Sequence, residues 1–315
     1  MSRILVLGAA GLLGINLAIE ANADHEVVGT LHRKHIQGAP FDTVTVDLVE
    51  VDALPVLLDK VKPDWLINCV ALANVDECEK QPGLAQALNV DLPRRLARDS
   101  AKRDIDLVHI STDAVFDGEQ GNYSEDDPAQ PLNAYGHSKL DGERAVLEAY
   151  PQAIVARVNF FGWGLDGQRS LAEFFYNNFS QGETALGLTD RYFSPLLVND
   201  LSQLLLSMLE VNLSGLYHVV SPVGLSKYDF GVALAKGFGF AEDMVEPVEA
   251  ESLNYVAPRA ADLRLNTGKL ENDLGADIPD VQAGIEKLYE LRQQGYPDQL
   301  KAMTNAEAAL SDRIQ

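Results

Sequence analysis

The sequence predicts an α/β fold in which helices cover both faces of a parallel sheet, followed by a smaller C-terminal unit. Strand-like and helix-like runs alternate from residue 3 to residue 158, and a glycine-rich turn joins the first strand to the first helix. Beyond residue 158 the alternation becomes irregular, which indicates a second unit of different construction.

The first element is an apolar strand at residues 3–8, followed by three glycines at intervals of three and by a helical run at residues 15–21. Glycines let the backbone turn tightly and approach phosphates, while a helix N-terminus offers unpaired N–H groups. A strand, a glycine turn and a helix in this order are typical of the pyrophosphate site of a Rossmann-like unit, although the spacing is G-x-x-G-x-x-G rather than G-x-G-x-x-G. The predicted cofactor-binding residues of this turn are Gly8, Gly11, Leu12, Leu13 and Gly14.

The following elements continue the alternation. Strand-like runs occupy residues 26–31, 43–47, 65–71, 106–111 and 153–158, and helical runs occupy residues 54–61, 84–102 and 138–149. Right-handed crossovers between parallel strands place helices on both faces, so the sheet is expected to be doubly wound. Ligands of such sheets bind at the carboxyl ends of the strands. We therefore expect Gly8, Asp47, Asn68 and Ser111 to lie along one edge.

The second half is less regular. It begins with a Gly-rich and aromatic stretch at residues 160–167, and the later runs are helical at residues 171–179, 227–237 and 281–294, with a strand at residues 215–220 that returns to the main sheet. These runs divide the chain into a dinucleotide-binding domain at 1–158, a mainly substrate-binding region at 159–296, and a polar tail at 297–315. The tail is expected to be a mobile helix rather than a functional element.

The chain is strongly acidic. Its 315 residues carry 25 Lys plus Arg against 47 Asp plus Glu, a formal net charge of -22. Such a field repels nucleic acid and anionic membranes, so neither is an expected partner. An anionic ligand must therefore find a local basic pocket. We also expect tolerance of molar salt, which loss of activity on moving from low to high salt would contradict.

Cysteine content and hydropathy bear on location. The two cysteines, Cys69 and Cys78, form no C-x-x-C pair, and no apolar stretch reaches the roughly 20 residues of a membrane helix. The apolar N-terminus is not interpreted as a secretory signal, because glycines interrupt it and strand periodicity resumes at residue 26. We expect a cytoplasmic protein with no disulfide and no metal site.

Tyr135 and Lys139 are four residues apart, which on a helix places a phenol and an ammonium group on one face. A nearby positive charge lowers a tyrosine pKa, so Lys139 is expected to bring the pKa of Tyr135 toward neutrality. Ser111 and Thr112 come where the strand at residues 106–111 ends, and they present two hydroxyls to the same crevice. Tyr135 and Lys139 are therefore a candidate proton-handling site.

Together with the glycine turn and the strand end at Asn68, these motifs resemble the extended short-chain dehydrogenase/reductases. Within that superfamily the chain resembles the dTDP-4-dehydrorhamnose reductase branch, in the text at residues 63–79, 111–118, 123–126, 131–143 and 259–269. The resemblance implies that Thr112 positions a substrate carbonyl, Tyr135 protonates its oxygen, and Lys139 tunes Tyr135 and holds the nicotinamide ribose. It also implies that Asn89 helps to wire the proton relay.

The cofactor is expected to be NADP(H), with NAD(H) as the alternative. NAD-preferring sites carry an acid after the second strand, whereas this chain has His32, Arg33 and Lys34 there. Arg33 is the candidate partner of a 2′-phosphate. By resemblance, Asp47 and Leu48 flank the adenine. The remaining cofactor-binding candidates follow the strand end at Asn68 and are Val70, Ala71 and Leu72.

The resemblance implies a nucleotide-sugar substrate, a 4-keto-6-deoxy sugar in this branch. Its candidate contacts are Thr112, Asp113, Phe160 and Arg259, the last a partner for the diphosphate. Ala114 replaces the tyrosine usual after Ser-Thr-Asp. A 4,6-dehydratase is disfavoured, because those relatives need a glutamate at this position.

Two alternatives to a reductase stay open from the sequence. The first is a binding or regulatory protein that resembles the methionine adenosyltransferase beta subunit. The second is an epimerase that uses the same residues with a tightly held NAD. The oligomeric state is a separate open point, and a homodimer would be ordinary for this architecture.

Overall fold

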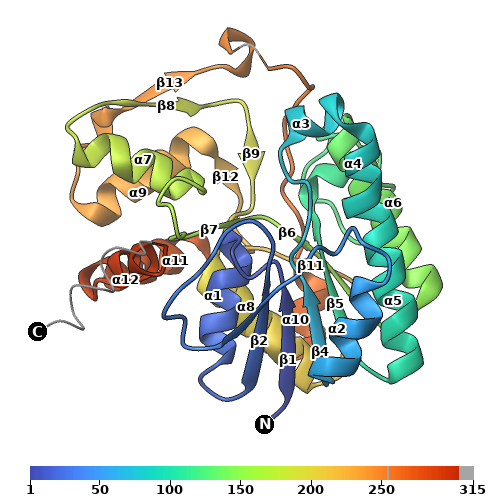
Figure 1. Cartoon of the computed structure of the whole chain (residues 1–315). Helices are drawn as coiled ribbons and strands as arrows, with labels where there is room; N and C mark the ends of the chain where they lie inside the picture. Colours follow the sequence, from blue (N-terminus) through green and yellow to red (C-terminus); the bar gives the residue numbers. More distant parts are fainter. Residues whose placement is uncertain (254, 305–315) are drawn as a thin grey trace, which may run out of the picture.

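A computed structural model describes residues 1–253 and 255–304. Its centre is a seven-stranded parallel sheet in the order β11-β6-β5-β4-β1-β2-β3 (Figure 1). The strands are β1 (Arg3–Leu7), β2 (Glu26–Leu31), β3 (Asp42–Thr45), β4 (Trp65–Asn68), β5 (Asp106–Thr112), β6 (Ile154–Val158) and β11 (Gly215–Val219). The order reverses at β1, which pairs with both β2 and β4, so the ligand crevice of this doubly wound sheet opens there. The predicted fold class is confirmed, including the returning strand β11.

Alternate residues of the buried strands supply two separate cores. On β1, Ile4 and Val6 belong to one core, and Leu5 and Leu7 to the other. The first core is covered by α1 (Leu12–Ala21) and α8 (Val198–Glu210), and the second by α2 (Ala53–Val61), α5 (Leu92–Arg103) and α6 (Ala134–Ala149). α10 (Gly268–Leu274) packs on β11.

A smaller unit stands beyond the carboxyl ends of the strands (Figure 1). Its helices are α7 (Leu171–Ser180), α9 (Lys227–Phe238) and α11 (Val281–Gln293), and its strand pairs are β7–β10 (Phe160–Phe161 with Leu196–Leu197), β8–β13 (Ala185–Leu188 with Val245–Val248) and β9–β12 (Tyr192–Phe193 with Leu225–Ser226). Its interior is aromatic, with Phe230 against Phe161, Phe175 and Phe193. α8, β11 and α10 belong to the main sheet, so the chain crosses between the two units more than once after residue 158.

The predicted helix at residues 84–102 is interrupted. The chain forms α3 (Val75–Lys80), which the sequence interpretation missed, then α4 (Pro82–Gln86), a π-helical turn η1 (Ala87–Asp91) and α5. Gly142 of α6 lies against the backbone carbonyl of Asn89 in this turn, where a Cβ atom would have no room. The close approach of α6 to η1 therefore requires a glycine.

The C-terminal segment differs from the expected mobile tail. Tyr296–Ala302 forms α12, in which Leu300 is fully buried. The Tyr296 hydroxyl donates a hydrogen bond of 2.7 Å to Oδ1 of Asn16 in α1, and the Nδ2 group of Asn16 donates to the carbonyl of Trp163 at 2.9 Å. Residues 305–315 of the predicted tail lie outside the described residues.

No helix within residues 1–253 and 255–304 is long and apolar enough to cross a membrane.

Candidate active site

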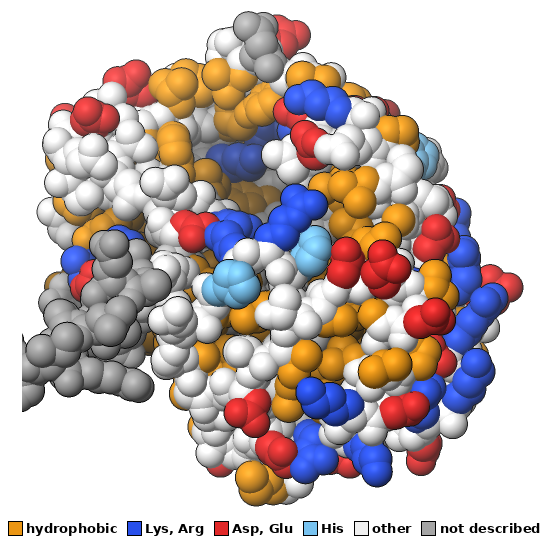
Figure 2. All heavy atoms as spheres, viewed as in Figure 1, with side chains coloured by type: hydrophobic (Ala, Val, Ile, Leu, Met, Phe, Trp, Pro, Cys, Tyr) orange, Lys and Arg blue, Asp and Glu red, His pale blue; other side chains and the backbone are white. Residues whose placement is uncertain are grey.

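Two cavities meet at the carboxyl ends of β5 and β6. The larger has a volume of about 390 Å³ and the smaller about 240 Å³. Their common wall consists of Thr112, Asp113, Tyr135 and Asn159. Figure 2 shows the hollow from outside, with Lys and Arg side chains within it. Two of the three predicted catalytic residues, Thr112 and Tyr135, therefore lie in the wall that separates the two cavities.

Helix α6 delivers Tyr135 and Lys139 to this wall. Asn133 caps the helix, because its Oδ1 accepts the Gly136 N–H at 2.9 Å, while its Nδ2 donates to the carbonyl of Pro258 at 3.0 Å. Lys139 is 2% exposed, and its Nζ donates to the carbonyl of Ile110 at 2.6 Å. α6 begins at Ala134, four residues before the predicted start, so both residues lie within it as expected.

The electrostatics of the pair differ from the sequence prediction. Burial raises the pKa of Tyr135 to about 12, with the charge of Asp113 adding to the rise and a hydrogen bond with Thr112 opposing it. Burial lowers the pKa of Lys139 to about 8. Burial, Thr112, Asp113 and Cys78 account for the shift of the Tyr135 pKa, and the Lys139 ammonium donates instead to the carbonyl of Ile110. The prediction that Lys139 lowers the pKa of Tyr135 was therefore wrong for this arrangement.

The glycine turn has the shape of a phosphate cradle. Gly8 has φ +80°, and its carbonyl accepts the Gly11 N–H at 2.9 Å. A Cβ atom on Gly14 would collide with the Gly8 carbonyl oxygen, so the helix and the turn touch backbone to backbone. No side chain caps the N-terminus of α1 and no acid lies in its first turn. These features fit the diphosphate of a dinucleotide.

The basic residues after β2 separate in the structure. The distance from Nε2 of His32 to Oδ2 of Asp47 is 3.6 Å, and Lys34 forms an ion pair with Asp166. Arg33 is exposed, and within the described residues it forms no ion pair. Of the three predicted cations, Arg33 therefore remains available to an anion.

The other cofactor candidates lie on two neighbouring strand ends. Leu48 is buried after β3, and Val70 and Ala71 line the smaller cavity with Lys139. The Leu72 N–H donates to Oδ1 of Asn89 at 2.9 Å. Asn89 is fully buried in the π-helical turn, and its Nδ2 also donates to the Ser138 hydroxyl at 2.9 Å. π-helical turns are frequent at functional sites.

The predicted substrate residues divide between the cavities. Arg259 lines the larger cavity, and Asp113 belongs to the common wall. Phe160 lines only the smaller cavity, beside Lys139, and so lies with the cofactor candidates.

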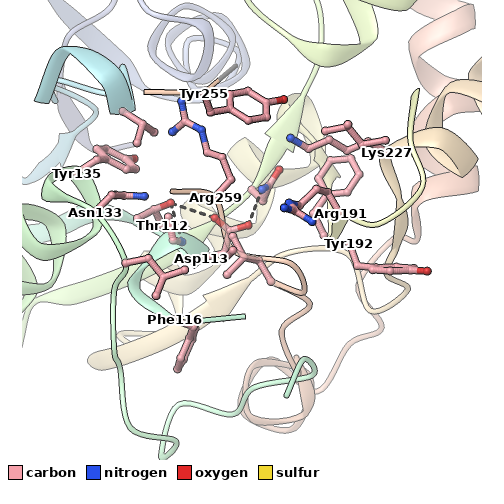
Figure 3. Close-up of a pocket in the computed structure, with 18 residues that line it drawn as sticks. Thr112, Asp113, Phe116, Asn133, Tyr135, Arg191, Tyr192, Lys227, Tyr255 and Arg259 are labelled. Atoms are coloured by element: carbon pink, nitrogen blue, oxygen red, sulfur yellow. Dashed lines mark hydrogen bonds between the residues drawn. The ribbon is translucent and has the colours of Figure 1, made fainter. Parts of the chain in front are cut away.

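Two further cations in the larger cavity were missed by the sequence interpretation. Arg191 and Lys227 line it together with Arg259, and Figure 3 shows all three around Asp113. The Nε atom of Arg191 and the Nη1 atom of Arg259 are buried without a hydrogen-bond partner. Three cations thus gather in one cavity of a chain with net charge -22, although Arg191 also pairs with Asp190 and Arg259 with Asp76. That contrast was the only sequence signal, since neither residue stands in a recognisable motif.

A buried ion pair connects two of the elements that carry the wall, α6 and β6. Arg157 of β6 and Glu143 of α6 form two hydrogen bonds of 3.0 and 2.8 Å, with both side chains no more than 4% exposed. Oε1 of Glu143 also accepts from the Ser111 hydroxyl at 2.5 Å. The guanidinium of Arg157 lies 4.9 Å from the ring centre of Phe116. This network joins α6, the helix that carries Tyr135, to β5 and β6.

Comparisons with known proteins agree with this architecture. A family model described as the RmlD substrate binding domain matches residues 1–293. A probable low-salt glycan biosynthesis reductase of Haloferax volcanii is 32% identical, with 90% of this chain and 96% of the relative covered. A dTDP-4-dehydrorhamnose reductase of Mycolicibacterium smegmatis is 30% identical (92% and 83% covered). Methionine adenosyltransferase 2 subunit beta of Mus musculus is also 30% identical (90% and 86% covered).

Solved structures give the same result. A hypothetical dTDP-4-dehydrorhamnose reductase from Sulfolobus tokodaii superimposes with a TM-score of 0.79 at 30% identity, covering 90% of this chain and 99% of that one. The dTDP-4-dehydrorhamnose reductase of Bacillus anthracis, solved in complex with NADP, shares the fold with a TM-score of 0.79 at 24% identity, covering 92% and 99%. The resemblance predicted from the motifs is confirmed.

Proposed function

The chain belongs to the RmlD substrate binding domain family, and from this premise we propose that it is an NADPH-dependent reductase of a nucleotide-linked 4-keto-6-deoxy sugar. The observation that carries the proposal is the wall of Thr112 and Tyr135 between the two cavities. A hydroxyl and a phenol there can reach a carbonyl in the larger cavity, while Lys139 lies only in the smaller one.

Each residue of the wall has a distinct part in this reaction. The nicotinamide supplies a hydride to the carbonyl carbon when it is bound in the smaller cavity. Reduction builds negative charge on the carbonyl oxygen, and Tyr135 donates a proton to it. Thr112 orients the Tyr135 hydroxyl, and Lys139 holds the ribose side of the smaller cavity with its ammonium. Tyr135 carries its proton at neutral pH, as a proton donor must, although a pKa raised to about 12 by burial makes it a weaker acid than a free tyrosine.

The assignment of NADP(H) has two supports in this chain. The turn at Gly8 and Gly14 fits a diphosphate, and Arg33 is the exposed cation after β2. The relative from Bacillus anthracis was solved in complex with NADP. NAD(H) remains the alternative, and the Arg33 variant described below separates the two.

The larger cavity is suited to a nucleotide diphosphate. Arg191, Lys227 and Arg259 line it, and although Arg191 pairs with Asp190 and Arg259 with Asp76, one buried N–H group of each arginine lacks a partner. A sugar diphosphate brings two negative charges and several acceptors to such a site. The relatives named dTDP-4-dehydrorhamnose reductase point to dTDP as the nucleotide.

Turnover of NADPH with a panel of nucleotide-linked 4-keto sugars tests the proposal. Wild type should oxidise NADPH in proportion to the sugar reduced, and Tyr135→Phe should lower kcat by about 10²-fold or more with cofactor affinity retained. Tyr289→Phe makes the same change at an exposed position on α11 outside both cavities, and should leave kcat unchanged. Turnover without net NADPH consumption would instead indicate an epimerase.

A second candidate is a non-catalytic NADP-binding regulatory subunit. It is favoured by the 30% identity to methionine adenosyltransferase 2 subunit beta. Tight NADPH binding with no oxidation across the whole panel, by wild type and Tyr135→Phe alike, would support this candidate and reject the reductase.

A further inference from the structure

The loop after β2, at residues 32–38, begins directly beside the glycine turn. Thr30 near the end of β2 holds the turn twice, because its hydroxyl accepts the Gly8 N–H and its carbonyl accepts the Ala9 N–H, each at 3.0 Å. In a Rossmann-like site the side chains that follow the second strand read the 2′ position of the adenine ribose. This loop carries Arg33 but no acid, which by itself favours a 2′-phosphate.

The structure brings an acid to this loop from elsewhere in the chain. Asp166 belongs to the segment between β7 and α7, and its Oδ2 atom accepts a hydrogen bond from Nζ of Lys34. The same oxygen accepts from Nε of Arg169 at 3.3 Å. The Lys34 and Asp166 side chains are 37% and 38% exposed, so the pair is open to a ligand at the surface. The hydrogen bond from Lys34 also lowers the pKa of the Asp166 carboxyl, which is therefore ionised at neutral pH.

The segment that carries Asp166 is fixed against the glycine turn. A Cβ atom on Gly164 would lie 3.3 Å from Cδ1 of Leu12, the first residue of α1 after the turn. The carboxylate of Glu173, which is fully buried in α7, accepts the Gly164 N–H and the Arg169 N–H, each at 2.7 Å. Asp166 is thus held between the glycine turn and the loop after β2, the two elements that contact the adenosine half of a dinucleotide in such folds.

A carboxylate at this place acts against a 2′-phosphate in two ways. It repels the phosphate directly, and it occupies the ammonium of Lys34, which would otherwise be a second cation beside Arg33. The hydroxyl of an unphosphorylated ribose can instead donate a hydrogen bond to a carboxylate, as it does in NAD-preferring sites.

We propose that Asp166 is a specificity-determining residue, which supplies from the segment before α7 the acid that NAD-preferring sites carry after the second strand. The choice between the two cofactors is then set by Arg33 against Asp166, and NADH is accepted beside NADPH. The inference rests on the proposed binding of a nicotinamide dinucleotide at the glycine turn.

Calorimetric titration of the full chain with NADPH and with NADH, at low ionic strength and without a substrate, tests the inference. In Asp166→Asn the ratio of the Kd for NADH to the Kd for NADPH should rise at least about fivefold, the effect of one unit charge on another at about 4 Å in water. In Lys34→Gln the same ratio should fall by a similar factor, because Asp166 then keeps its charge without the ammonium. Both shifts should shrink at molar salt, which screens exposed charges.

The two variants separate electrostatics from structure, since each breaks the same ion pair between side chains that are more than a third exposed, and both should fold. A pair that only fixed the segment would shift the ratio in the same direction in both variants, or in neither, and either result overturns the proposal. Asp141→Asn removes an exposed acid paired with Arg144 on α6 and should leave the ratio unchanged. Wild type that binds NADPH but not NADH would also refute the role of Asp166, whereas binding of neither would overturn the proposed cofactor and this inference with it.

Discussion

Replacing Gly14 by alanine tests the contact on which the cofactor site depends. A Cβ atom at Gly14 would lie 2.8 Å from the carbonyl carbon of Gly8, whereas carbon atoms pack best about 3.5–4.0 Å apart. Helix α1 must therefore retreat by about 1 Å from the turn, at a cost of about 1–3 kcal/mol for overpacking. The higher helix propensity of alanine than of glycine offsets about 1 kcal/mol of this destabilisation.

The expected effect is larger on binding than on stability. The retreat moves the first N–H groups of α1 away from the turn, so the Kd for NADPH should rise at least tenfold, which is about 1.4 kcal/mol. Calorimetric titration with NADPH and thermal unfolding measure the two effects. Gly83→Ala is the matched control, because a Cβ atom on Gly83 in α4 meets nothing within 4 Å. If Gly14→Ala binds NADPH as tightly as Gly83→Ala, the close contact between turn and helix is refuted.

Three further predictions concern charge. Arg33→Asp should reverse or abolish the preference for NADPH over NADH in kcat/KM, and an unchanged ratio would exclude Arg33 as the 2′-phosphate partner. Glu143→Gln should lower the free energy of unfolding in urea by about 3 kcal/mol, because Arg157 keeps a buried charge without its carboxylate. Asp141→Asn, which breaks an exposed pair on the same helix, should cost less than about 1 kcal/mol, and equal losses would contradict the burial argument. Burial lowers the pKa of His218 to about 3, so unfolding takes up a proton below the unfolded value of about 6.5. Stability should therefore fall as the pH drops from about 6.5 toward 3, less steeply in His218→Gln, and equal slopes in urea titrations at each pH would reject this assignment.

Regular periodicity made the parallel sheet predictable. The strands around Leu5 and Leu66 are buried on both faces, and a short apolar run between glycine or polar signals is typical of that position. The glycine turn was equally predictable, because only glycine allows φ +80° at Gly8 and the backbone contact at Gly14 without strain.

The remaining features depend on contacts between distant residues. No local pattern indicates that Lys139 bonds to the carbonyl of Ile110, so the direction of the Tyr135 pKa could not be predicted from their spacing. The π-helical turn around Asn89 arises where α6 packs at Gly142, some 50 residues along the chain. Arg191 enters the larger cavity from the position just before β9, where the surrounding sequence carries no motif.

The link from Asn16 to both Trp163 and Tyr296 has a consequence for how the protein can be modified. One side chain in the first helix bonds both to Trp163, where the smaller unit begins, and to Tyr296, where α12 begins. A chain cut before Tyr296 would leave Oδ1 of Asn16 without that donor and would expose the surface that Leu300 covers. Shortened forms made for crystallisation or fusion should therefore retain α12 in full. Removing α12 would disturb Asn16 in α1, the helix that follows the glycine turn near the start of the sequence.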